Sequence, residues 1–155
     1  MKNKVIKTAK LTIIASLVLT VLSFYGCAKA GIGGPSYTVD AAGDGLQVVP
    51  VSSSTATGTI SGSFDGSKNI MSGVINWAGL SGVPTAIHIH NGGVGKNGYA
   101  TFVMVNVPKT QTGSMSFSSA FTESQETGVS KNTYYFDIHT SAFPEGEIRG
   151  QIIAH

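Results

Sequence analysis

The sequence predicts an all-β protein, folded as one antiparallel Greek-key β-sandwich. From residue 46 onward, short segments alternate apolar and polar side chains, which is the period of a strand with one buried face. Gly, Pro, Asn and Asp stand between these segments, where turns are expected. Only 12% of the residues are charged, and nothing resembles a long amphipathic helix. About seven or eight strands at this spacing favour a sandwich or barrel.

Residues 1–26 are expected to be a signal peptide that precedes the fold. Four lysines in the first ten residues form a basic segment, and residues 11–24 carry no charge. An apolar run of this length suits a signal peptide and is short for a membrane-spanning helix, which needs about 20 apolar residues.

The only cysteine of the chain, Cys27, is expected to carry lipid. Residues 22–27, Leu-Ser-Phe-Tyr-Gly-Cys, resemble a lipobox, in which the thiol is acylated and the cysteine becomes the new N-terminus. Two alternatives are a secretory signal with an incidental cysteine and an uncleaved anchor. Lipidation would hold the protein on a membrane of the cell envelope, the outer membrane rather than the inner, with its domain outside the cytoplasm.

Removal of the signal peptide reverses the net charge. The whole chain is +2, and the part after residue 26 keeps six basic residues against eight acidic ones. No basic patch remains that could attract nucleic acid, so we expect no nucleic-acid partner.

The mature chain is expected to hold a tether and one domain. Residues 27–44 are small and Gly-rich, which is typical of a flexible tether, and residues 45–155 form the domain. Asp65-Gly66 is a turn signal that makes a hairpin of the strands on either side. Residues 124–129 fit either one helical turn or a loop. The predicted strands are 46–51, 57–64, 70–77, 85–90, 99–107, 114–121, 134–140 and 147–153.

Two histidines share one face of a predicted strand. In Ile-His-Ile-His at residues 87–90, the strand period places His88 and His90 on one face and both isoleucines on the other. Histidines two apart on a strand lie roughly 7 Å from each other, which allows both imidazoles to reach one metal ion. The alternative is that they bond across the sheet or cap the Gly-rich loop of residues 91–98.

A third histidine, His139, shares a face with Tyr135 and Asp137 on the predicted strand 134–140. If this strand lies beside residues 85–90, three imidazoles converge on a site suited to copper or zinc. Asp137 and Glu147 are then candidates for residues that support the metal ligands.

Glu147 and Arg149 belong to the closing strand, and we expect them to have a structural role. They share a face at positions i and i+2, so they could form an ion pair. Alternatively, the Arg149 guanidinium could bond to carbonyls or to a carboxylate such as Asp137.

Several of these segments together resemble the chordin-type (CHRD) domain. The resemblance extends over residues 45–153 and is carried by residues 46–51, 57–59, 88–98, 139–140 and 144–151. It implies an immunoglobulin-like or superoxide-dismutase-like β-sandwich, and the matching histidines of the family fall on His88, His90 and His139. Chordin antagonises bone morphogenetic proteins, but its cysteine-rich modules are missing from this chain, so that activity is not expected.

Three functions compete at this point. The first is a non-enzymatic binding or adhesion module, with an extracytoplasmic protein or a small ligand as its partner. The second is an envelope copper- or zinc-binding protein that uses His88, His90 and His139. The third, an enzyme similar to copper/zinc superoxide dismutase, is not expected, because that resemblance calls for further metal ligands and for a disulfide. No nucleophile motif suggests a hydrolase either.

Overall fold

The computed structural model describes residues 34–155, which lie within one compact unit of residues 31–155. The predicted signal peptide, Cys27 and the first part of the predicted tether lie outside the described residues. No helix in the described part is long and apolar enough to cross a membrane.

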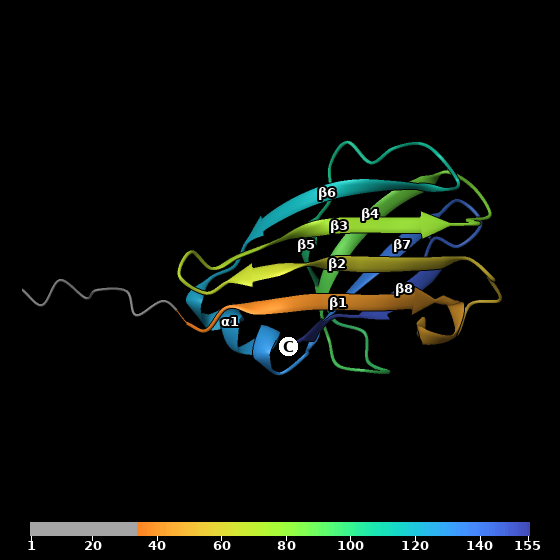
Figure 1. Cartoon of the computed structure of the whole chain (residues 1–155). Helices are drawn as coiled ribbons and strands as arrows, with labels where there is room; N and C mark the ends of the chain where they lie inside the picture. Colours follow the sequence, from red (N-terminus) through yellow and green to blue (C-terminus); the bar gives the residue numbers. More distant parts are fainter. Residues whose placement is uncertain (1–33) are drawn as a thin grey trace, which may run out of the picture. The chain divides into compact units, whose positions relative to one another are not determined.

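Nine antiparallel strands, one α-helix and one short 3-10 helix make up the described chain (Figure 1). Hydrogen bonds join the strands into one sheet in the order β5-β4-β7-β8-β1-β2-β3-β6, and β9 also pairs with β1. The predicted all-β antiparallel class is therefore confirmed. The elements are β1 Tyr37–Asp44, β2 Thr57–Asp65, β3 Ile70–Ala78, β4 Pro84–Asn91, β5 Tyr99–Val103, β6 Gly113–Ala120, α1 Glu123–Ser130, β7 Tyr134–Thr140, β8 Ile148–Gln151 and β9 Ile153–Ala154.

The sheet curls into a nearly closed barrel. Its two outer strands, β5 and β6, line the two sides of one groove, although they are not paired with each other. The predicted hairpin is confirmed as β2 and β3, whose register runs without a break from Thr57 opposite Ala78 to Asp65 opposite Ile70.

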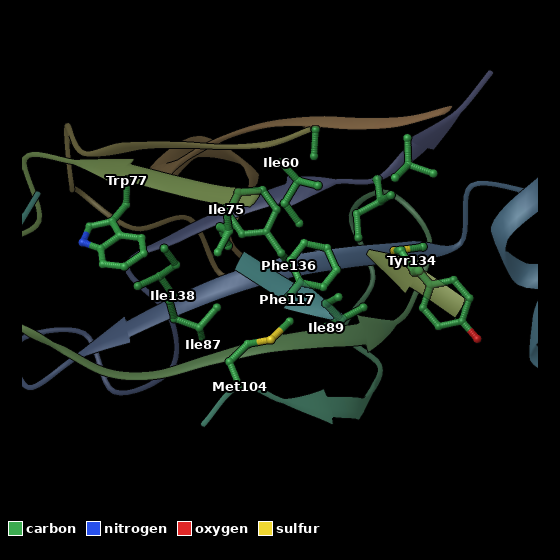
Figure 2. Close-up of a cluster of buried hydrophobic side chains, with 14 of the residues drawn as sticks. Ile60, Ile75, Trp77, Ile87, Ile89, Met104, Phe117, Tyr134, Phe136 and Ile138 are labelled. Carbon is green, nitrogen blue, oxygen red and sulfur yellow. The ribbon is translucent and has the colours of Figure 1, made fainter. Parts of the chain in front are cut away.

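One hydrophobic core fills the inside of the curled sheet (Figure 2). The inward positions alternate along each strand, as the period of two predicts. In β4, Ile87 and Ile89 are fully buried, so His88 and His90 must point to the other face. In β7, Phe136 and Ile138 are fully buried in the same way. The core therefore fixes which side chains of these two strands face outward.

Strand β1 corrects the predicted tether and the predicted start of the domain. Residues 37–44, assigned to a flexible segment, pair with β2 along their whole length. Their inward side chains are small because the space is narrow: a Cβ on Gly43 would lie 2.6 Å from the Phe136 ring. A strand with such small inward residues has the composition of a linker, although it belongs to the sheet.

Residues 46–51, predicted as a strand, form none. Asp44 caps a short 3-10 helix, Gly45–Gln47, by accepting a hydrogen bond from the backbone of Gln47 at 3.1 Å. Val48, just after this helix, is buried, whereas Leu46 within it and Val51 beyond it are 76% and 62% exposed. The apolar run therefore belongs to a loop with much of its surface in water.

Two smaller predictions are refined. Strand β5 ends at Val103, four residues earlier than predicted, and Asn106 beyond it has a positive φ of 57°, which interrupts an extended chain. The segment 124–129, for which a helical turn was one alternative, lies within α1. The Gln125 side chain accepts a hydrogen bond from the Thr122 backbone at 2.8 Å and thus helps to start the helix.

Candidate metal centre

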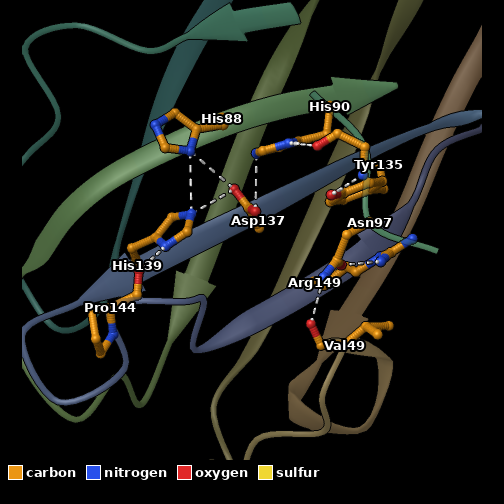
Figure 3. Close-up of polar contacts among 10 residues, drawn as sticks. Val49, His88, His90, Asn97, Tyr135, Asp137, His139, Pro144 and Arg149 are labelled. Atoms are coloured by element: carbon orange, nitrogen blue, oxygen red, sulfur yellow. Dashed lines mark hydrogen bonds and ion pairs between the residues drawn. The ribbon is translucent and has the colours of Figure 1, made fainter. Parts of the chain in front are cut away.

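Neighbouring strands β4 and β7 bring the three predicted histidines together. In their antiparallel register, His88 lies opposite Asp137, and His139 lies opposite Ala86. The side chains of His88, His90, Asp137 and His139 meet on the outer face of the sheet (Figure 3). The sequence predicts that the three imidazoles converge if the two strands are neighbours, and the structure shows that the strands are neighbours and that the imidazoles converge.

Four donor atoms, one each from His88, His90, Asp137 and His139, lie within 4.8 Å of one another. His88 Nδ1 is 3.2 Å from His139 Nε2 and 3.4 Å from Asp137 Oδ1. Asp137 Oδ1 is 3.1 Å from His139 Nε2, and Asp137 Oδ2 is 3.1 Å from His90 Nε2. Four ligands at 2.0–2.1 Å around a tetrahedral ion are about 3.4 Å apart, so these contacts are close to the spacing of a zinc-type site.

Two of the imidazoles are oriented by backbone carbonyls. His90 Nδ1 lies 2.9 Å from the Gly98 carbonyl, and His139 Nδ1 lies 2.8 Å from the Pro144 carbonyl. A carbonyl can only accept, so each Nδ1 carries a proton when its ring is neutral. The lone pair of each neutral ring is then on Nε2, the nitrogen that points into the cluster. Metal-binding histidines are held in this way by a partner on their second nitrogen.

The centre of the cluster has unsatisfied polar atoms. Among the described residues, His90 Nε2 and Asp137 Oδ1 are buried and have no hydrogen bond of suitable geometry, despite their ion-pair distances. Buried polar atoms are nearly always satisfied, so such atoms require an explanation. A metal ion at the centre would satisfy both.

The Asp137 carboxylate is the negative centre of this group. Burial alone would raise its pKa, but the contacts with His139, His88 and His90 outweigh burial and hold the pKa far below its usual range. Asp137 is only 6% exposed. It therefore stays ionised and can neutralise charge on a cation or on the imidazoles.

The histidine pKa values respond to the same carboxylate. The close contact with the Asp137 carboxylate is the main reason that the pKa of His139 is raised, and burial opposes it. For His90 burial is the largest influence and lowers the pKa, but Asp137 and the Gly98 carbonyl outweigh it, so the pKa is raised. In the absence of metal, protons thus occupy His90 and His139 more readily than they occupy a free histidine.

A stack of side chains extends from the cluster toward β8. The His90 ring is parallel to Tyr135 within 8°, with 4.9 Å between centroids. The Arg149 guanidinium also packs on the Tyr135 ring, with its Cζ 3.6 Å from the ring centroid. The Arg149 Nη2 donates to the Gly93 carbonyl at 2.9 Å, so the predicted bond to a carbonyl is observed.

The predicted Glu147–Arg149 ion pair is not present among the described residues. Glu147 is fully buried and instead accepts hydrogen bonds from the Ser54 and Thr140 hydroxyls and from both the hydroxyl and the backbone of Ser81, all at 2.6–2.8 Å. These bonds connect two loops to the end of β7. Glu147 contacts none of the three histidines through hydrogen bonds, so it does not support the metal ligands in the predicted way.

The chemistry of the donor set suits a transition metal. Three imidazoles and one carboxylate supply the nitrogen and oxygen ligands that Zn²⁺ and Cu²⁺ accept. The sequence identified the histidines but treated Asp137 only as a supporting residue. Its position two residues before His139, on the same face of the strand, was the signal for a direct role. The group His88, His90, Asp137 and His139 could thus hold a metal ion.

Comparison with known proteins gives one match. The family model described as "CHRD domain" matches residues 39–152, which include every residue of the cluster and, in β1, residues 39–44, which were predicted to belong to the tether. Neither the curated proteins nor the solved structures contain a match to this chain.

Proposed function

Since the chain belongs to the CHRD domain family, we propose that it is a non-enzymatic envelope lipoprotein whose CHRD domain binds one copper or zinc ion. The ligands would be His88, His90, His139 and Asp137. This keeps the broader expectation of a binding module and names what is bound.

The orientation of the imidazoles carries the proposal. Hydrogen bonds across a sheet would satisfy histidines without any need for Nε2 atoms to converge. Here the carbonyls of Gly98 and Pro144 hold two rings so that both Nε2 atoms face Asp137. Three imidazole nitrogens in contact with one carboxylate, two of them with a fixed tautomer, match a metal site better than they match a structural hydrogen-bond network.

The number of ligands supports binding rather than catalysis. Catalytic zinc sites keep three protein ligands and one open position, whereas structural sites use four protein ligands. With Asp137 as the fourth ligand, a tetrahedral zinc ion has no position left for a substrate or water. We therefore propose no superoxide-dismutase activity. For the arrangement of the sheet, we propose a two-layer β-sandwich of the immunoglobulin-like or superoxide-dismutase-like kind.

In that arrangement, β1, β2, β3 and β6 form one layer, and β4, β5, β7 and β8 form the other. Figure 1 supports this arrangement, because the layer of β1, β2, β3 and β6 overlies the layer of β4, β5, β7 and β8. The buried side chains of β2 and β3 then meet those of β4 and β7 between the layers (Figure 2).

The location is the second part of the proposal. A signal peptide of residues 1–26 and a lipid on Cys27 would place the domain on a membrane of the cell envelope, outside the cytoplasm. Mass spectrometry of the protein from membranes tests it: an acylated Cys27 as the N-terminal residue is expected. An intact N-terminus, or a mature chain that starts elsewhere, would contradict it.

Metal analysis of the purified unit, residues 31–155, tests the site. After loading with zinc or copper and removal of excess metal, we expect one ion per chain in the parent protein and in His155→Ala. His155 is the matched control, because it is the one described histidine outside the cluster and pairs with Asp40. His88→Ala and His139→Ala should lose the bound metal. A parent protein that holds no metal, or variants that keep it, would contradict the site.

A further inference from the structure

A pocket lies on the other side of Tyr135 from the histidine cluster. Its volume is about 380 Å³, and it is formed by residues 46–51, by Val94 and Gly95 of the Gly-rich loop, and by Arg149 and Gln151 of β8. Small-molecule sites usually have volumes of roughly 300–1,000 Å³. None of the four residues of the metal centre lines it.

The rim of the pocket is apolar and exposed. Leu46, Val51 and Val94 are exposed by 76%, 62% and 79%, and all three line the pocket. They come from two loops far apart in the sequence. Apolar side chains gathered around one opening mark a binding site more often than single exposed ones do.

A buried cation with neutral partners lines the same pocket. Arg149 is only 3% exposed, and its guanidinium donates to the Gly93 carbonyl at 2.9 Å and to Asn97 Oδ1 at 3.4 Å. Figure 3 shows the guanidinium beside Asn97, near Val49 of the rim loop. In the described part of the chain, no carboxylate lies within ion-pair distance of Arg149. Buried charges are generally paired, so this arginine has capacity for an anion.

We propose that this pocket binds a small aliphatic carboxylate, with the carboxylate on Arg149 and the chain against Leu46, Val51 and Val94. The chemistry of the two surfaces determines the class of ligand. The apolar rim favours an alkyl chain, and a guanidinium matches the two oxygens of a carboxylate. The proposal uses no metal ligand and goes beyond the metal-binding function.

The test uses octanoate and the metal-free unit of residues 31–155, studied by isothermal titration calorimetry. We expect saturable one-to-one binding that is weakened at least tenfold in Val94→Asp, because this substitution adds a negative charge to the rim. Val105→Asp is the matched control, since Val105 is 72% exposed and does not line the pocket, and it should bind octanoate like the parent. Equal weakening in both variants, or no binding to the parent, would overturn the proposal.

A ligand series separates the two parts of the recognition. Affinity should rise about fourfold for each CH₂ added from hexanoate to octanoate, the increment expected when each methylene is buried. Octanol and octyltrimethylammonium should bind at least tenfold more weakly than octanoate, and Arg149→Gln should remove this preference. Equal binding of octanol and octanoate would overturn the role of Arg149.

Vesicles of anionic phospholipid distinguish a free ligand from a membrane surface. The same rim could touch a bilayer, and the unit would then bind vesicles of phosphatidylglycerol but not monomeric octanoate. That result would overturn the proposal. Because metal is absent throughout, failure of this series leaves the metal-binding proposal intact, and failure of metal loading leaves this one intact.

Discussion

Two buried carboxylates of this domain have opposite surroundings. Asp137 is 6% exposed and faces three imidazoles, whereas Glu147 is fully buried and faces hydroxyl and amide donors. Three hydroxyls and one backbone amide together satisfy the Glu147 carboxylate with hydrogen bonds. An imidazole can instead present a nitrogen lone pair, which is a far better ligand for Zn²⁺ or Cu²⁺ than a neutral hydroxyl, so the surroundings of Asp137 can accept such a cation. Burial of a carboxylate therefore does not indicate a metal site; imidazole nitrogens around it do.

The largest expected effect is on metal affinity at Asp137. Asp137→Asn keeps the shape of the side chain but removes its charge and one ligand oxygen. We expect affinity for Zn²⁺ to fall at least 100-fold, or about 2.7 kcal/mol, measured by competition with a chelator. A change of less than threefold would show that Asp137 is no ligand and that only the three histidines act.

The matching substitution at Glu147 should have the opposite profile. Glu147→Gln replaces one carboxylate oxygen by an NH₂ group. This group cannot accept the hydrogen bonds that the Ser81 and Thr140 hydroxyls donate to Glu147 Oε2. Leaving buried donors without acceptors costs about 1–3 kcal/mol, so the free energy of unfolding in urea should fall by about 2–3 kcal/mol. Affinity for Zn²⁺ should stay within threefold of the parent. If Glu147→Gln removed metal binding from a folded protein, the contrast between the two carboxylates would be wrong.

The strand period predicts most residues of the candidate metal centre, but it does not predict that they meet. Alternation places His88 and His90 on one face and His139 with Asp137 on another, whatever the fold. Whether these faces meet depends on β4 lying beside β7, about 50 residues apart, and pairing over that distance follows from the whole core rather than from local sequence. The sequence therefore gives the candidates, and the sheet order brings them together.

In β1 and in residues 46–51, composition and burial disagree. The inward positions of β1 include Gly43, because Phe136 and the β8 backbone occupy the space beside it. Residues 46–51 have the opposite pattern, since Leu46 and Val51 are apolar yet point into water around the pocket. Hydrophobicity normally indicates burial, and this rule fails at close contacts between backbones and at surfaces that bind ligands.

The pH dependence of the metal-free protein should also separate the two carboxylates. The pKa values of His90 and His139 are raised in the folded state. Their stabilising contribution is therefore complete below about 6.5, the usual histidine pKa, and is lost as the pH rises through the raised values. In chelator, the urea midpoint of the parent should fall from pH 6 toward pH 9. In Asp137→Asn the urea midpoint should depend less on pH than in the parent, and in Glu147→Gln it should fall with rising pH as in the parent.

Metal affinity should change with pH in the reverse direction. Protonated imidazoles cannot bind a metal, so Zn²⁺ affinity should rise as the pH passes through the raised histidine pKa values, by up to about tenfold per pH unit for each proton released. A pH-independent affinity between pH 6 and 8 would argue against His90 and His139 as ligands.

The smallest expected effect is at Tyr135, which is not a proposed ligand but stacks on His90. Tyr135→Phe keeps the ring between His90 and Arg149 but removes the hydroxyl that accepts a hydrogen bond from the Gly98 backbone at 3.3 Å. Since the Gly98 carbonyl orients His90, a looser Gly98 should lower Zn²⁺ affinity by about threefold and stability by about 0.5–1 kcal/mol. Thr101→Val, with a hydroxyl that has no partner among the described residues, is the control and should change affinity by less than the error of the titration. An effect at Tyr135 as large as that at Asp137 would mean that His90 is positioned mainly by its stacked neighbour, and that the carbonyl is secondary.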